Sequence, residues 1–131
     1  MTSTAEKVTK GSKKSVGASR GLRIGMVAPP WFAVPPQGYG GTEAVVASLV
    51  DGLVDRGHEV HLIAAGAPGT KAQHYVRSFE EPPTHRLGVG WLPEVITAAE
   101  TARAFAHLDL DIVHDHSGAG DDRVPAAGVA P

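Results

Sequence analysis

The sequence contains no cysteine, so it can form neither a disulfide framework nor a thiolate metal site. Aromatic residues make up only 5% of its 131 residues. No apolar run approaches the roughly 20 residues that a membrane-spanning helix needs. No apolar stretch follows the first lysines, which excludes a secretory signal peptide. These absences favour a cytoplasmic protein and leave room only for peripheral contact with a membrane.

Charge is distributed unevenly along the chain. Residues 1–21 carry five basic side chains and one acidic one, whereas the remaining residues carry seven basic and thirteen acidic side chains. The Ser, Thr, Lys and Gly content of residues 1–21 predicts a disordered, solvated basic tail. The acidic body argues against nucleic acid as a partner, because such partners require a basic surface.

Glycine and proline are plentiful, and they separate apolar segments. Residues 22–28 form a short apolar run that Pro29 and Pro30 end, which predicts a strand buried on both faces of a parallel sheet. After a loop over residues 29–41, a helix is predicted over residues 42–56, with Thr42 as its N-cap and Gly57 as its stop signal. Its apolar face consists of Val46, Leu49, Val50, Leu53 and Val54.

The rest of the chain continues the alternation of strands and helices. Residues 58–65 are predicted to form a second strand, which completes a right-handed βαβ unit. A short third strand, a helix and a further strand are then predicted over residues 75–79, 93–107 and 111–116. The sequence therefore predicts an α/β fold, a Rossmann-like parallel sheet with flanking helices.

Glycines stand directly before the predicted first helix. A helix N-terminus presents free N–H groups that suit a phosphate, so Gly40, Gly41 and Thr42 are predicted to bind one, the alternative being a tight turn needed for packing. The segment is not a dinucleotide fingerprint, because Glu43 stands where the third glycine belongs, and no P-loop lysine follows. The loop also holds three aromatic side chains that either stack on a ligand or pin the loop: Trp31, Phe32 and Tyr39.

Histidines mark the end of the predicted strand over residues 111–116. His114 and His116 point to the same face of that strand, where they have either a hydrogen-bonding role toward a ligand or a structural one. Two histidines without a third ligand are weak evidence for a metal site. His58 and His61 are three residues apart on a strand, a poor metal geometry, and we interpret both as structural. If the strands over residues 22–28 and 111–116 are neighbours, the glycine loop and His116 face one crevice.

The segments 22–29, 34–36, 39–43, 56–60 and 111–117 together resemble glycosyltransferase family 4, in order and at fitting spacing. The resemblance implies a retaining, nucleotide-sugar-dependent enzyme of the GT-B fold, in which two Rossmann-like domains face each other across a cleft. Residues 22–131 correspond to part of the N-terminal, acceptor-side domain. The C-terminal, donor-binding domain is absent from this sequence.

The resemblance also assigns roles to particular residues. Gly40 and Gly41 approach the donor diphosphate or the acceptor, and His116 contacts the transferred sugar as the catalytic candidate. No metal or other cofactor is required, and the partners are a nucleotide sugar and an unknown acceptor. Because the groups that stabilise the leaving diphosphate are missing, we expect the 131-residue chain alone to be inactive. The alternatives are a small non-catalytic α/β module that binds a phosphorylated or sugar ligand, and a degenerate remnant without activity.

Overall fold

A computed structural model describes residues 21–118 of the chain. Its centre is a four-stranded, fully parallel sheet with the strand order β3-β2-β1-β4. The strands are β1 (Arg23–Val27), β2 (Glu59–Ala64), β3 (His74–Arg77) and β4 (Ile112–Asp115). The predicted α/β, Rossmann-like parallel sheet is confirmed.

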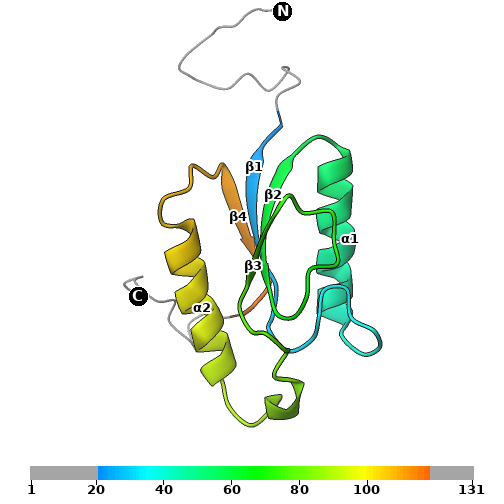
Figure 1. The fold of residues 1–131 in the computed structure, drawn as a ribbon, viewed down its shortest axis with the longest axis vertical. Helices are drawn as coiled ribbons and strands as arrows, with labels where there is room; N and C mark the ends of the chain where they lie inside the picture. The colour runs from blue at the N-terminus through cyan, green and yellow to red at the C-terminus, as the bar shows by residue number, and fades with distance from the viewer. Residues whose placement is uncertain (1–20, 119–131) are drawn as a thin grey trace, which may run out of the picture.

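Two helices flank this sheet on opposite sides (Figure 1). Helix α1 (Gly41–Asp55) connects β1 to β2, and helix α2 (Leu92–Phe105) leads from β3 back to β4. The two connections run to opposite sides of β1, and right-handed crossovers in opposite directions place their helices on opposite faces. A short 3-10 helix, η2 (Thr84–Arg86), precedes α2 and was not predicted.

The main hydrophobic core lies between the sheet and α1. It follows the alternation of strand side chains, because every second residue of β1 and β2 points toward α1. Its buried members include Ile24, Met26, Ala28, Val46, Val50, Val60, Leu62 and Ala64. Val46 and Val50 lie one helical turn apart and have no exposed surface, so α1 is held by the apolar stripe that its sequence predicts.

The opposite face of the sheet is organised around Gly25. Its register partners are His61 on β2 and Val113 on β4, and His61 in turn pairs with His74 on β3. A Cβ atom on Gly25 would lie 2.6 Å from Cε2 of Phe105, at the end of α2. The absence of a side chain at residue 25 therefore lets α2 approach the sheet closely.

The elements occur where the sequence predicts them, with shifts of one or two residues at their ends. One prediction is wrong, because Thr42 is not the N-cap of α1. Gly40 takes that position with φ 134° and makes no side-chain capping bond, and its carbonyl accepts from the Ala44 N–H at 2.9 Å. A backbone with this φ favours glycine, so the helix begins one residue before Thr42. Gly57, with φ 93°, ends the helix as predicted.

Two further predictions concern the ends of the chain and the membrane. The predicted basic tail and the stretch after Gly118 lie outside the described residues, apart from Gly21. Between residues 21 and 118, no helix is both long and apolar enough to cross a bilayer.

Candidate functional site at the carboxyl edge of the sheet

The sheet changes its direction of growth between β1 and β4. From β1 the chain adds β2 and then β3 on one side, and it crosses back through α2 to place β4 on the other side of β1. Such a switch point leaves a crevice beyond the carboxyl ends of the two strands, where ligands of open α/β sheets bind. The loop after β1 and the residues after β4 both begin there, and the His116 N–H donates to the Val27 carbonyl at 2.9 Å. The two strands are neighbours, which is the condition on which the sequence placed the glycine loop and His116 at one crevice.

The loop after β1 is fastened to the body of the protein. Trp31 and Val34 are buried, and the Trp31 carbonyl accepts a hydrogen bond from the Thr84 hydroxyl of η2. Glu43 in the first turn of α1 is 3% exposed, and the backbone of Phe32 hydrogen-bonds to its carboxyl group. Burial raises the pKa of Glu43, and hydrogen bonds from the backbone of Glu43 itself and of Phe32 lower it by less. Glu43 was not among the predicted site residues. The feature that could have indicated it is an acidic residue in an otherwise apolar stretch of the helix.

The aromatic residues of the loop divide between the two interpretations left open by the sequence. The buried Trp31 pins the loop. Tyr39 is 83% exposed and packs edge-to-face on Phe32, with their ring centroids 5.6 Å apart. Its remaining surface is accessible to a ligand.

The glycines before α1 also divide into two kinds. Gly40 is required by the turn, because a Cβ there would lie 3.0 Å from Cβ of Pro36 and the backbone has φ 134°. A Cβ on Gly41 would have no heavy atom of another segment within 4 Å, and Gly41 and Thr42 are both exposed. Packing among the described residues therefore gives no reason for glycine at residue 41. Its effect is to leave the N–H groups at the start of α1 open to an approaching group.

His116 presents a polar atom that lacks a partner. Its Nε2 is buried and makes no hydrogen bond within residues 21–118. The His114 and His116 rings lie on the same face, as predicted, with centroids 4.0 Å apart. Burial lowers the pKa of His116, the neighbouring His114 lowers it further, and Asp115 opposes both. The imidazole is therefore neutral at neutral pH, and its Nε2 is suited to a hydrogen bond with a ligand hydroxyl.

Asp115 fixes the turn that follows β4. Its Oδ1 accepts from the Ser117 N–H at 2.7 Å and from the Ser117 hydroxyl at 2.6 Å. Asp115 thus has a structural role next to His116, and the turn fixes the position of the histidine just after the carboxyl end of β4.

A hollow of about 420 Å³ lies on the other side of the loop after β1. It is bounded by that loop and by the segments that follow β2 and β3, and its lining includes Val34, Gln37, Gly66, Gly69, Arg77 and Glu80. Arg77 and Glu80 form an ion pair of 2.9 Å at its wall. None of the predicted residues Gly40, Gly41, Thr42 and His116 lines this hollow, so it extends the carboxyl edge beyond the predicted site.

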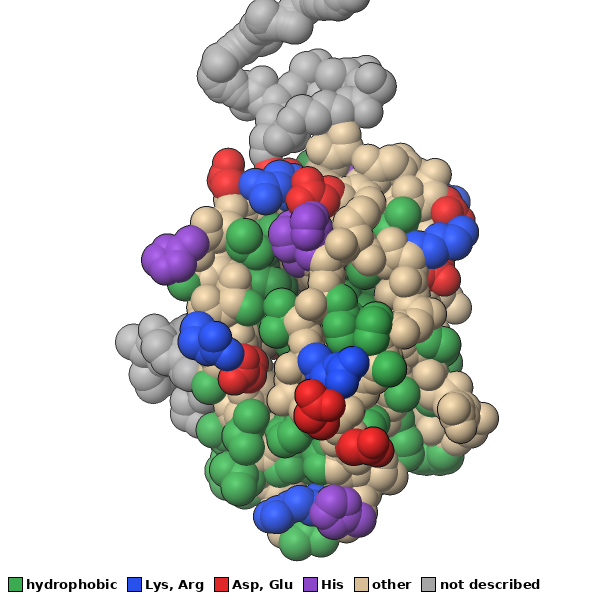
Figure 2. Space-filling model, in the orientation of Figure 1, with side chains coloured by type: hydrophobic (Ala, Val, Ile, Leu, Met, Phe, Trp, Pro, Cys, Tyr) green, Lys and Arg blue, Asp and Glu red, His purple; other side chains and the backbone are tan. Residues whose placement is uncertain are grey.

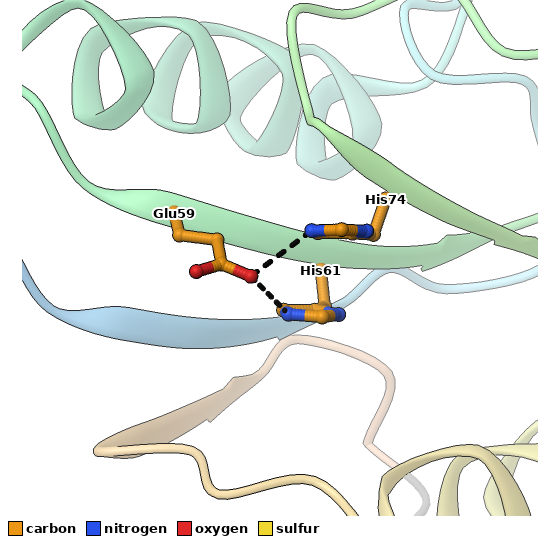
Figure 3. A group of neighbouring side chains, drawn as sticks. All are labelled: Glu59, His61 and His74. Carbon is orange, nitrogen blue, oxygen red and sulfur yellow. Dashed lines mark hydrogen bonds and ion pairs between the residues drawn. The ribbon is translucent and has the colours of Figure 1, made fainter.

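A second polar cluster, which the sequence analysis missed, lies toward the amino end of the sheet (Figure 3). The Nε2 atoms of His61 and His74 each lie 3.0 Å from Oε2 of Glu59. Burial would raise the pKa of Glu59, but hydrogen bonds from both histidines and the charge of Arg23 together lower it. Burial also lowers the pKa of His61, against the Glu59 hydrogen bond. The interpretation of His61 as structural overlooked His74, which pairs with it across two strands. A Glu-x-His pattern on one strand was the available signal.

Comparison with known proteins gives the class to which this architecture belongs. Residues 39–127, more than half of the chain, match Glycosyltransferase Family 4. The chain therefore belongs to glycosyltransferase family 4, and the resemblance inferred from its motifs is confirmed.

One curated relative is a phosphatidyl-myo-inositol mannosyltransferase from Mycolicibacterium smegmatis (strain ATCC 700084 / mc(2)155). The two sequences are 32% identical over 111 residues, and the match covers 72% of this chain but 24% of the relative. The chain thus spans about a quarter of the length of that protein.

Proposed function

We propose that this chain is the acceptor-side N-terminal part of a retaining glycosyltransferase that moves a sugar from a nucleotide-sugar donor to an acceptor. In this proposal the open N-terminus of α1, at Gly40, Gly41 and Thr42, receives a phosphate group of the donor or the acceptor. His116 is the catalytic candidate, and its Nε2 hydrogen-bonds to the transferred sugar. A cytoplasmic location belongs to the same proposal.

The observation that carries the proposal is the pair of unsatisfied features on the two sides of the switch point. On the β1 side, Gly41 leaves the helix start open although no neighbouring segment within the described range 21–118 requires it to be glycine. On the β4 side, the buried Nε2 of His116 lacks a partner among the described residues. Buried polar atoms are nearly always paired, so a ligand hydroxyl at this position accounts for the second feature. A phosphate at the helix start accounts for the first.

The relative suggests which substrates to test first. It is named as a mannosyltransferase that acts on phosphatidyl-myo-inositol, so we propose a nucleotide-mannose as the first donor and an inositol phospholipid as the first acceptor. The proposed transfer uses no resident metal. Chelation with EDTA should therefore leave the rate of transfer unchanged.

The decisive experiment compares two forms of the protein in one assay, release of nucleoside diphosphate from the donor. The first is the protein as its source cells make it, and the second is the 131-residue chain. We expect turnover only in the first, because a transferase must stabilise the leaving diphosphate and the described residues offer no basic clamp for it. Turnover by the 131-residue chain would overturn the expectation that it is inactive alone. Absence of turnover from both, across nucleotide sugars, would overturn the proposal.

Binding measurements separate this proposal from a non-catalytic ligand-binding module. Backbone NMR of the 131-residue chain, titrated with a nucleotide sugar and separately with an inositol phosphate, should show shifts at Gly41, Thr42 and His116. A non-catalytic module gives the same shifts but no turnover in any form of the protein. A degenerate remnant gives neither.

A further inference from the structure

The cluster formed by Glu59, His61 and His74 places three metal-binding atoms on one face of the sheet. Glu59 and His61 are two residues apart on β2 and so point to the same face, and His74 is the direct register partner of His61 on β3. One ligand atom from each residue lies within 4.8 Å of the others. The side chains point toward one another from two adjacent strands (Figure 3).

The distances are close to those of a coordination shell. Zinc bonds to imidazole nitrogen and carboxylate oxygen measure about 2.0–2.2 Å, which in a tetrahedral shell separates neighbouring ligand atoms by roughly 3.3 Å. The two Nε2 to Oε2 distances are 3.0 Å each. The imidazole rings are stacked, with centroids 4.1 Å apart and 11° between their planes. A shared cation requires the rings to tilt apart, and the half-exposed His74 side chain has the freedom to do so.

The surroundings orient the carboxylate. Nε of Arg23 lies 3.4 Å from the other oxygen of Glu59, Oε1, which leaves Oε2 directed at the histidines. The backbone N–H of Arg23 donates to the Asp111 carboxylate at 2.7 Å, and its guanidinium donates to the Asp109 carbonyl. A partner that holds the second oxygen of a ligating carboxylate is the usual support of a protein metal site.

From this geometry we infer that Glu59, His61 and His74 form a binding site for a zinc-like divalent transition metal. The site lies near the amino ends of β2 and β3, away from the switch point at the carboxyl ends of β1 and β4, so its metal is structural and takes no part in sugar transfer. It cross-links β3, a four-residue outer strand, to the buried β2. Solvent supplies the remaining coordination position on the exposed side.

The ligand set selects among cations. Imidazole nitrogen suits zinc, nickel and copper, whereas magnesium and calcium require mostly oxygen ligands. The positive charge of Arg23 near Glu59 further disfavours a cation that is held by charge alone. Zinc should therefore bind at one equivalent per chain, and magnesium should not bind.

The test uses the 131-residue chain stripped of metal with a chelator. Isothermal titration calorimetry and native mass spectrometry with zinc chloride give stoichiometry and affinity, and thermal melting with and without zinc gives stabilisation of the fold. We expect one zinc ion per chain and a higher Tm with zinc, because a ligand that binds only the folded state raises stability. The absence of both effects with zinc in excess would overturn the inference.

Variants locate the site. His74→Ala should weaken zinc binding at least about tenfold and abolish the rise in Tm. Glu59→Gln should also weaken zinc binding and abolish the rise in Tm. Because the side chains of His74 and Glu59 are both partly exposed, neither substitution should unfold the protein. His85→Ala removes an exposed histidine of η2 and serves as the matched control, with unchanged binding expected. If instead His114→Ala abolishes zinc binding and His74→Ala does not, the metal belongs to the histidine pair on β4 and the inference is wrong.

Discussion

The two ends of the sheet treat their polar groups in opposite ways. Toward the amino end, Glu59 satisfies two histidines and is itself held by Arg23, so the charged and polar groups pair with one another. In Figure 2, histidine, acidic and basic side chains gather on the face near the end where the strands begin. At the carboxyl end, the buried Nε2 of His116 has no partner among residues 21–118, and Gly41 leaves a helix start open. The paired groups at the amino end hold β2 and β3 together, directly or through the proposed metal, whereas the unsatisfied groups at the carboxyl end favour the ligand of the proposed function.

Substitution of His116 should have the largest effect, and chiefly on activity. In an active enzyme that contains this segment, His116→Ala should lower kcat/KM by about 10²-fold, the typical cost of one lost hydrogen bond to a transition state. The free energy of unfolding should change by less than about 1 kcal/mol, because this Nε2 makes no hydrogen bond in the part of the chain that the structure describes. The control His114→Ala should have a smaller effect on kcat/KM. Equal losses in both variants would contradict a specific role for His116.

Gly25→Ala should have the converse effect to His116→Ala, because it should destabilise the fold. The added Cβ would lie 2.6 Å from Phe105 and 2.9 Å from Leu110. Overpacking of this kind costs about 1–3 kcal/mol, measurable by urea unfolding. Gly52→Ala in α1 is the matched control, since its added Cβ would meet only the Arg56 guanidinium, at 3.4 Å. That control should be neutral or stabilising by up to about 1 kcal/mol.

Gly41→Ala should lower ligand affinity without lowering the stability of the fold. Among the described residues, the new methyl group meets no heavy atom of another segment within 4 Å, so the free energy of unfolding should stay the same or rise by up to about 1 kcal/mol. Affinity for the phosphate-bearing ligand should fall, as followed by NMR titration, because the methyl group occupies the approach to the helix start. Unchanged affinity would show that residue 41 is glycine for some reason other than ligand binding.

The smallest expected effect is on the pH dependence of stability, to which His116 contributes. Burial and then His114 place its pKa below the ordinary 6.5, with Asp115 opposing. At pH values between the pKa of His116 in the folded protein and 6.5, the unfolded chain binds more protons than the folded chain. The stabilisation from a neutral His116 is therefore fully present above pH 6.5 and is lost as the pH falls. Urea unfolding at about pH 7.5 and about pH 5.5 should show a smaller loss in His116→Asn than in the wild type. The same loss in both proteins would contradict the lowered pKa.

Much of the fold follows from local signals in the sequence. The strand over residues 22–28 is specified by its apolar run, and it occurs where predicted. The helix is specified by the spacing of its apolar residues and by Gly57 at its end, and it also occurs where predicted. The N-cap was misplaced because the helix start is set by the positive φ of Gly40, and side-chain preference favoured Thr42. The strand over residues 111–116 also occurs where predicted, but its apolar residues Ile112 and Val113 are 53% and 48% exposed. Burial depends on what covers a strand, and no local pattern carries that information.

The site was predictable to the extent that it follows from topology. The positions of Gly40, Gly41 and His116 at strand and helix ends could be inferred, because parallel strands end at a common edge. Two features could not. Glu43 turns inward to the Phe32 backbone, which depends on the path of the loop. The pairing of His61 with His74 depends on the register of β2 against β3, which a single strand does not reveal.

The fastening of the loop after β1 has a consequence for affinity. The loop is held at Trp31 through Thr84, at Phe32 through Glu43 and at Val34 by burial. Immobilising a free loop of this length during binding would cost conformational entropy for every residue ordered. Here that entropy is lost when the chain folds, before a ligand arrives. A ligand bound as proposed would therefore meet a preorganised rim, and little of its contact energy would be spent on ordering the protein.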